Sequence, residues 1–309
     1  MLSPSAGSSA LRGIALFIGA SLSFACMDTL AKYLARDGVP VLQITWARYF
    51  FSIFCLALLI PRLRDGRRVW SQRPGLQLGR SALLLAVTLM FFTVFSMLPL
   101  VEAVSIGFTT PLMVTALAGL WLHEKVDAAR WAAVFAGFLG VLVVIRPLDD
   151  VVADWPSLLM LLTAFLNALY HLSTRAIAGI DPPETTILYT NVVGAVVLSV
   201  AVPFIWVSVT GIVWVEFAAL GFFAFMGHYL LIWAYSSAPA STLAPYTYMI
   251  VIWVGFLGYG VFGDLPDRWT VIGSLIVIAA GLYVFRRETQ LRRAARAAPQ
   301  SGAEIDGAG

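Results

Sequence analysis

The chain has 309 residues, of which 60% are hydrophobic and 12% are charged, and its formal net charge is +3. Soluble globular proteins carry about 25% charged residues, so this chain has too few charges to cover a surface that faces water. The composition excludes a soluble globular protein, a disordered chain and a disulfide-rich scaffold. It predicts an all-α, polytopic membrane protein.

Ten stretches are apolar over about 20 residues, the length that a membrane-spanning helix needs. In chain order they are 13–35, 41–60, 79–98, 100–122, 129–146, 155–175, 185–206, 213–235, 240–262 and 269–286. The runs are almost continuously apolar, which favours helices over the alternating strands of a membrane barrel. The first run continues through Asp28 and Lys32, so we expect a retained helix rather than a cleaved signal.

The positive charges predict how the chain sits in the membrane. If the N-terminus is cytoplasmic, fifteen of the 20 Lys and Arg residues face the cytoplasm, and Arg36, Arg146 and Arg268 face the other side. Positive charges concentrate on the cytoplasmic side of membrane proteins, so we expect both termini to be cytoplasmic in a bacterial inner membrane. The same distribution explains the basic isoelectric point without a nucleic-acid partner.

The two halves of the chain match each other weakly. A shift of 143 residues, reduced to 140 after an indel, pairs Asp28 with His171, Lys32 with Arg175, Pro99 with Pro239, Glu124 with Asp264 and Asp127 with Asp267. Each half has five helices, and because five is odd the second half enters the membrane with the opposite sense. The pattern therefore predicts a 5+5 inverted-topology repeat, an arrangement common in secondary transporters.

The repeat divides the chain into four segments. They are an N-terminal tail 1–12, repeats 13–147 and 148–286, and a C-terminal tail 287–309 that is expected to be disordered. Glu124 and Asp264 are expected at opposite membrane faces, as helix-end residues that set packing.

Ionisable groups within the spans are candidates for function, because each costs about 2.5–3.5 kcal/mol to insert at the centre of a helix. Asp28 and Lys32 are one turn apart and share a helix face. They form either a structural ion pair or part of the transport pathway, in which Asp28 binds a cationic group or a proton. Arg48 either grips a carboxylate or phosphate, or is a buried anchor to Asp28 or to backbone carbonyls.

A second polar stripe lies on the sixth span, where Asn167, His171 and Arg175 are spaced by four residues. Lipid cannot satisfy polar groups, so this face must point inward. His171 either relays protons or makes an inter-helix hydrogen bond. The repeat should bring Asp28 and His171 toward one shared site near the midplane.

Two aromatic residues complete the predicted substrate-binding set. Trp233 and Tyr248 either belong to interfacial belts or stack on a planar substrate. The three histidines and two cysteines show no metal-ligand spacing, and no phosphate-binding Gly-rich loop is present in the sequence. We therefore expect no catalytic residues, no metal and no cofactor.

Several motifs resemble the EamA type of the drug/metabolite transporter superfamily over residues 13–286. They are Asp28-x-x-x-Lys32, Trp46-Ala47-Arg48-Tyr49, Leu98-Pro99-Leu100-Val101-Glu102-Ala103, Phe108-Thr109-Thr110-Pro111-Leu112, Leu122-His123-Glu124-Lys125, Tyr235-Ser236-Ser237-Ala238-Pro239-Ala240 and Phe262-Gly263-Asp264. The sequence departs from the family at Asp264, where Glu is usual, and repeat 2 has Asn191 where repeat 1 has Arg48.

The resemblance implies a secondary transporter of a small organic metabolite that works by alternating access. The motifs look like the bacterial branch that includes riboflavin and S-adenosylmethionine carriers, so a vitamin, an S-adenosylmethionine-like compound or an amino-acid derivative is the expected substrate. The expected partners are this substrate and the lipid bilayer, with the chain working as a monomer. The alternatives are a multidrug or amine exporter of the same superfamily and, less favoured, an intramembrane enzyme.

Overall fold

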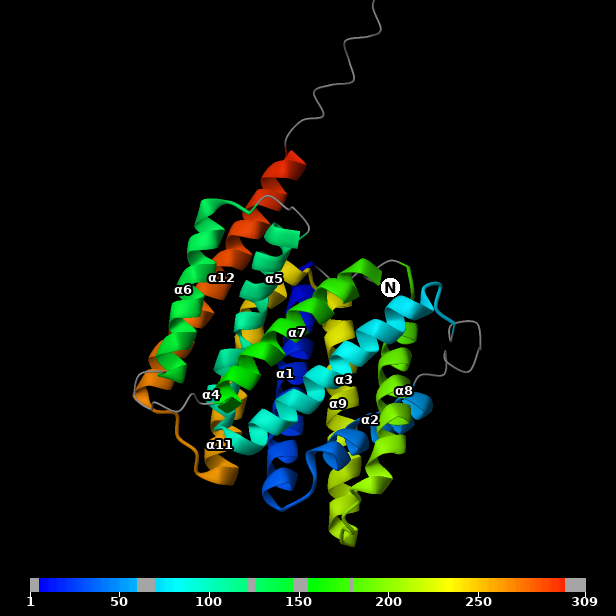
Figure 1. Ribbon diagram of the computed structural model, residues 1–309. Coiled ribbons are helices and arrows are strands. Elements are labelled where there is room, and N and C mark those ends of the chain that lie inside the picture. The colour runs from blue at the N-terminus through cyan, green and yellow to red at the C-terminus, as the bar shows by residue number, and fades with distance from the viewer. Residues whose placement is uncertain (1–5, 60–69, 122–125, 147–154, 178–179, 298–309) are drawn as a thin grey trace, which may run out of the picture.

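The computed structural model describes residues 6–59, 70–121, 126–146, 155–177 and 180–297, and the regular elements in these ranges are helices (Figure 1). The first half contains α1 (Ala6–Arg36), α2 (Val41–Leu59), α3 (Pro74–Met97), α4 (Leu100–Gly107), α5 (Thr109–Trp121) and α6 (Ala128–Ile145). The second half contains α7 (Trp155–Ile177), α8 (Pro183–Ala201), η2 (Val202–Phe204), α9 (Gly211–Ser237), α10 (Ala240–Leu243), η3 (Ala244–Tyr248), α11 (Met249–Phe262) and α12 (Arg268–Ala297).

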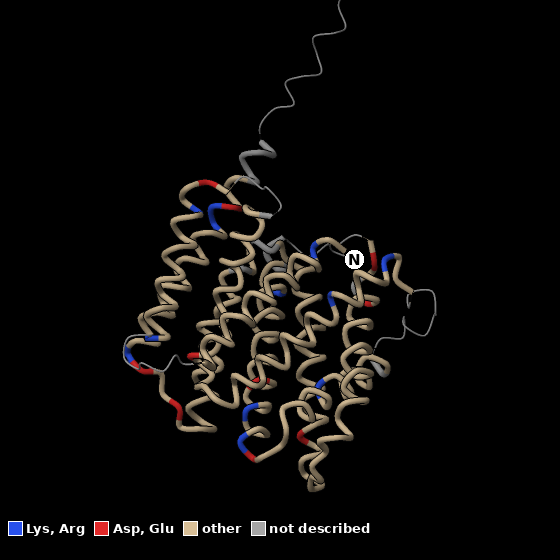
Figure 2. Tube along the Cα trace, viewed as in Figure 1, with Lys and Arg blue, Asp and Glu red and all other residues tan. Residues whose placement is uncertain are grey.

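The helices have the length and composition of membrane spans. Within the described ranges, nine helical segments are long and apolar enough to cross a bilayer, and Val41–Ala57 is a shorter apolar helix. Charged residues gather near the ends of the bundle, and the middle of most helices carries none (Figure 2). Large apolar side chains such as Phe135 and Leu275 are exposed, which suits a surface covered by lipid. The predicted all-α polytopic fold is confirmed.

Two predicted spans are interrupted. The span expected at 100–122 consists of α4 and α5, and the span expected at 240–262 consists of α10, η3 and α11. Proline has no N–H to donate and is tolerated in the first turn of a helix. Pro111 lies in the first turn of α5 and Pro245 lies in η3, so each interruption coincides with a proline that cannot continue the preceding helix.

The prediction that the chain is disordered from residue 287 is wrong up to Ala297, because α12 continues to that residue. The extension is rich in Arg, Glu, Gln, Leu and Ala, all good helix formers. Their intrinsic helix propensity outweighs the basic, Ala/Gly/Pro-rich composition on which the prediction of disorder relied. Residues 298–309 lie outside the described residues.

The helix packing is symmetric between the two halves. α1 packs on α9 as α7 packs on α3, α2 packs on α9 as α8 packs on α3, and α1 packs on α11 as α7 packs on α5. α2 with α8 and α6 with α12 are their own counterparts. In Figure 1, α1 and α6 run down the view, whereas α7 and α12 run up it. The predicted inverted repeat is therefore present in the packing.

Matching aspartates begin the last helix of each half. Asp127 accepts a hydrogen bond from the backbone N–H of Arg130 at 3.3 Å, and Asp267 accepts one from that of Thr270 at 2.8 Å. These are N-terminal caps, in which a carboxylate satisfies a free backbone donor of the first turn. The 140-residue shift that pairs the two aspartates in the sequence thus also pairs their structural roles.

The same aspartates tie α6 to α12 at both ends. The Asp127 carboxylate binds Arg287 Nε at 2.7 Å, and the Asp267 carboxylate binds Arg146 Nη1 at 2.5 Å. Between these pairs the backbones approach so closely that a Cβ at Gly273 would lie 2.5 Å from the carbonyl oxygen of Gly140. Small residues allow such contacts between membrane helices. α6 and α12 therefore form a tightly packed pair, pinned at both membrane faces.

We predict that Asp127→Asn lowers the midpoint of thermal unfolding of the protein in detergent. The hydrogen bond from Arg287 lowers the pKa of Asp127 to about 2. A lowered pKa means that the carboxylate stabilises the fold above its ordinary pKa and loses this effect only as pH falls toward 2. The loss on mutation should therefore be equal at pH 5 and pH 8. The control is Asp37→Asn, because Asp37 is exposed and forms no ion pair with a described residue. A larger effect at pH 8 than at pH 5 would contradict the assignment.

Candidate functional site

A cavity of about 450 Å³ lies between helices of both halves, a volume in the range of pockets that hold drug-sized ligands. Its lining runs from Phe17 on α1 and Tyr235 in the last turn of α9 to Asp28 on α1. It thus extends toward the face at which α1 begins, hereafter the N-terminal face. Most of the wall is apolar, with aromatic rings from Phe17, Phe24, Phe91, Phe92, Phe95, Phe108, Tyr170 and Tyr235.

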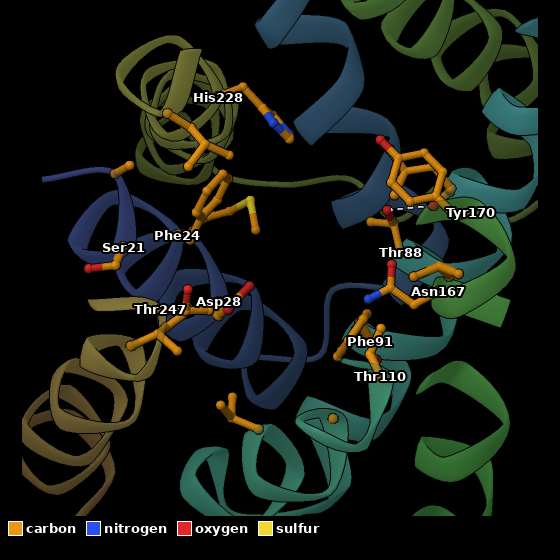
Figure 3. A pocket seen from close by; sticks show the side chains of 18 of the residues that line it. Ser21, Phe24, Asp28, Thr88, Phe91, Thr110, Asn167, Tyr170, His228 and Thr247 are labelled. Carbon is orange, nitrogen blue, oxygen red and sulfur yellow. Dashed lines mark hydrogen bonds between the residues drawn. The ribbon is translucent and has the colours of Figure 1, made fainter. Parts of the chain in front are cut away.

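The polar groups of the cavity lie on facing walls. Figure 3 shows Asp28 and Thr247 on one side, and Thr88, Asn167 and Tyr170 across from them. The charged residues among the described lining are Asp28 and Arg48, which have opposite signs. The wall therefore carries a formal net charge of zero.

Asp28 is buried in this wall without a direct ionic partner. Arg48 is close enough to interact with its carboxylate electrostatically, but Asp28 forms no hydrogen bond or ion pair with any described residue. The structural alternative for the predicted pair of Asp28 and Lys32 is wrong, because the ammonium group of Lys32 binds Asp264 instead. One helical turn brings the two residues to one face, but the long lysine side chain reaches a different partner.

Arg48 reaches the cavity from α2 and is 6% exposed. Its Nη1 donates to the Thr88 hydroxyl at 3.2 Å, and its guanidinium lies over the Tyr49 ring at 4.6 Å. The partners of Arg48 are therefore the Thr88 hydroxyl group and the Tyr49 ring. The sequence analysis had offered Asp28 or backbone carbonyls as the partners in one of its two alternatives. Arg48 Nε is buried and has no partner, and Nη2 donates no hydrogen bond to a described residue.

Asn167 and His171 both line the cavity, as the inward-facing stripe on the sixth span predicts. The expectation that Asp28 and His171 share one site is confirmed, since both lie on the wall of the same cavity. The Asn167 amide forms no hydrogen bond with a described residue. His171 makes an edge contact with the Tyr170 ring, at 5.5 Å between centroids.

The other four predicted binding residues, Lys32, Arg175, Trp233 and Tyr248, lie outside the cavity lining. Arg175 is exposed, one turn beyond His171 on α7. Trp233 is exposed on α9 and its ring lies 6.2 Å from that of Tyr229. The Tyr248 ring packs at 4.8 Å against Phe108, which itself lines the cavity. Tyr248 thus supports a lining residue from behind.

A charged cluster lies beyond Asp28, at the end of the cavity away from the N-terminal face. Lys32 is 1% exposed, and its Nζ donates to Asp264 at 2.6 Å and to the backbone oxygen of Leu98 at 2.9 Å. Arg36 reaches the same carboxylate at 3.5 Å, and both cations lie over the Phe262 ring. The cluster joins α1 to the end of α3 and to the residues that follow α11, one helical turn beyond Asp28.

Asp264 was expected to be a helix-end residue that sets packing. It does follow α11 directly, and its ion pair with Lys32 gives that packing role a definite partner. Its counterpart in the repeat, Glu124, lies outside the described residues.

Arg80 is a functional candidate that the sequence reasoning missed. Its side chain is fully buried, and it lies over the Tyr170 ring at 5.0 Å. Its guanidinium donates to the Tyr170 hydroxyl at 2.9 Å, Thr190 Oγ1 at 2.6 Å and the Thr186 carbonyl at 3.0 Å. Arg80 was counted among the charges of the cytoplasmic face, because the predicted span began at residue 79. The structure begins α3 at Pro74, so Arg80 lies inside the helix and holds Tyr170 in the cavity wall.

A bundle of membrane-crossing helices that encloses a cavity between inverted repeats defines a polytopic membrane transport protein. The chain belongs to the EamA-like transporter family, which matches it twice, over residues 11–146 and 154–286. This confirms the resemblance found in the motifs.

Two relatives are similar over nearly their whole length. The riboflavin transporter of Vibrio cholerae serotype O1 is 27% identical over 290 residues, covering 93% of this chain and 97% of that protein. The S-adenosylmethionine uptake transporter of Rickettsia bellii is 26% identical over 279 residues, covering 89% of this chain and 94% of that protein. The chain is therefore a multi-pass inner-membrane transporter of a small metabolite, and not an enzyme.

A solved structure titled "Crystal structure of protein" shares the fold. It superimposes with a TM-score of 0.56 at 16% sequence identity, covering 94% of this chain and 99% of that chain.

We predict that Asp264→Asn destabilises the protein more than Lys32→Met does. The substitution takes away the carboxylate charge that contacts the buried Lys32 ammonium group and leaves only neutral oxygens in its place, and breaking a buried ion pair in this way costs about 3–5 kcal/mol. Removing the ammonium leaves a carboxylate that is partly exposed and still near Arg36. Thermal unfolding in detergent measures both effects.

The double variant Lys32→Met/Asp264→Asn is the decisive comparison, because it removes both charges together. It should unfold at a higher temperature than Asp264→Asn alone. If the two single effects simply add in the double variant, the two side chains do not stabilise each other.

Proposed function

We propose that this chain is a secondary transporter of riboflavin or a closely related uncharged flavin, working by alternating access. The observation on which the proposed substrate rests is the cavity wall, which is mostly apolar, contains eight Phe and Tyr side chains, and has one acidic and one basic residue. Aromatic side chains stack favourably on planar rings. The name of the Vibrio cholerae relative supports the same substrate.

The charge balance of the wall favours a neutral substrate over a cation. S-adenosylmethionine carries a sulfonium charge, and in this cavity that charge would be added to a wall whose own charges already cancel. An uncompensated charge in apolar surroundings costs several kcal/mol. Riboflavin has no formal charge and brings polar groups that hydrogen-bond to the lining.

The proposed cycle exchanges the shapes of the two halves. The cavity lining reaches the last turn of α9 and the Lys32 cluster lies at the other end, and both observations support a state that is open at the N-terminal face. We infer that this face is cytoplasmic and that the state is inward-open. Opening the other side requires the ion pair between Lys32 and Asp264 to separate. We further propose that one chain contains the whole pathway and works as a monomer.

The test of substrate is radiolabelled riboflavin flux into proteoliposomes that contain the purified full-length protein. We expect saturable riboflavin uptake that unlabelled S-adenosylmethionine does not inhibit. Arg48→Ala should abolish uptake, and Arg48→Lys should restore little of it, because an ammonium group lacks the planar fork. Asp28→Asn should also reduce uptake, because the Asp28 carboxyl group lines the cavity and interacts electrostatically with Arg48.

The matched control is Arg12→Ala, which removes an exposed arginine on α1 outside the cavity lining and should leave uptake unchanged. All variants must be recovered from the membrane at wild-type levels. Uptake of S-adenosylmethionine in place of riboflavin would refute the proposed substrate, and full uptake by Arg48→Ala would refute the proposed site.

Orientation is tested independently of transport. We predict that the segment 62–73 and the tail after Arg286 are both cytoplasmic, because most of the Lys and Arg residues outside the helices fall on that side. Fusions at each segment to a reporter that is active only in the cytoplasm should give signal, and fusions to a periplasmic reporter should not. Periplasmic activity at both segments would reverse the predicted orientation. Periplasmic activity at only one segment would contradict the predicted number of spans between them.

A further inference from the structure

We infer that the free edge of the Arg48 guanidinium recognises a ring nitrogen and the neighbouring carbonyl oxygen of a planar heteroaromatic substrate. The inference rests on the proposed function, because it names the atoms that the same cavity reads. In riboflavin the matching pair is N5 and the oxygen on C4 of the isoalloxazine ring.

The hydrogen bonds of Arg48 show which edge is available. Nη1 is held by Thr88, and the ring of Tyr49 lies against the flat face of the guanidinium. Nε and Nη2 then remain, and together they form the edge from which arginine makes two parallel hydrogen bonds. Nε is buried with no partner, which is unfavourable until an acceptor binds to it.

The residues around Arg48 hold its guanidinium group in a fixed position, so the unpaired Nε is not simply a side chain that happens to lack a partner. Thr88 is itself fixed, because its hydroxyl also contacts the Tyr49 hydroxyl at 3.0 Å and donates to the Leu84 carbonyl at 2.8 Å. Two neighbours thus hold the guanidinium in one plane at the cavity wall. A group held this firmly selects acceptors by position as well as by charge.

The neighbouring Asp28 carboxyl group favours one of the two kinds of acceptor pair that fit such an edge. A carboxylate or phosphate would bring its charge and further acceptor oxygens into the same wall as this carboxyl group, which interacts electrostatically with Arg48. A ring nitrogen beside a carbonyl oxygen offers the same two acceptors with no added charge. This is the pattern by which arginine reads N7 and O6 of guanine. The aromatic lining then accommodates the faces of the ring.

The test replaces one atom of the substrate. In 5-deazariboflavin the N5 nitrogen is a C–H group, so the shape is kept and one acceptor is lost. Binding of riboflavin and of the deaza analogue to the purified full-length protein is followed by quenching of flavin fluorescence. We expect the analogue to bind about tenfold or more weakly, the loss of one hydrogen bond to a charged donor.

Two variants show whether Arg48 is responsible for the difference. Arg48→Lys keeps the positive charge and loses the fork, so it should bind both flavins weakly and equally. Asn167→Leu alters another lining residue, which has no hydrogen-bond partner among the described residues. It should weaken both flavins while keeping the ratio between them, and a changed ratio would assign the recognition to Asn167.

The outcomes separate the inference from the proposed function. Riboflavin binding with equal affinity for the deaza analogue overturns the inference and leaves the proposed function standing. Failure of riboflavin itself to bind or move overturns the proposed function, and the inference with it. Inhibition of riboflavin binding by free acetate or inorganic phosphate, weakened in Arg48→Lys, would assign the edge to anions and also overturn the inference.

Discussion

The rest of the structure depends on the cost of leaving a charge unpaired among apolar helices. Arg80 meets that cost with hydrogen bonds to α7 and α8, and Lys32 meets it with Asp264 and a backbone oxygen. Each of these two side chains therefore connects helices whose contact could not be predicted from the sequence. Arg48 and Asp28 are different, because both line the cavity while Arg48 Nε and the Asp28 carboxyl group have no hydrogen-bond partner among the described residues. This unused hydrogen-bonding capacity is the reason for proposing that they bind the substrate.

Local pattern was enough to predict most of the fold. The apolar runs gave the spans, and an odd number of spans per half gave the inverted sense of the second half. Asp127 and Asp267, which the repeat pairs in the sequence, both cap the N-terminus of the helix that follows them. Such a role can be predicted from the sequence, because N-capping depends only on the residues that follow. The errors were also local in origin. Hydropathy alone marked neither the interruption after α4 nor the helical continuation of α12 to Ala297.

The candidate site was predicted less completely, because long side chains choose partners that lie far apart in the sequence. Asp28, Arg48, Asn167 and His171 do line one cavity, since helical spacing and the repeat constrain where they point. The partner of Lys32 is 232 residues away, and no spacing rule gives it. Arg80 was missed because charge near a span end is usually solvated, and only tertiary packing shows it to be buried.

Symmetry and asymmetry have separate roles in this molecule. The contacts between helices are symmetric under exchange of the two halves, which is the property that the proposed alternating-access cycle requires. The cavity wall does not follow this symmetry, because repeat 1 has Arg48 at the position where repeat 2 has Asn191. The Asn191 amide donates a hydrogen bond to the Ile187 carbonyl of its own helix. A substrate without twofold symmetry needs one fixed recognition group, not two. In the proposed cycle, a symmetric frame with one arginine fork would therefore let the helices exchange positions while the substrate keeps a single orientation.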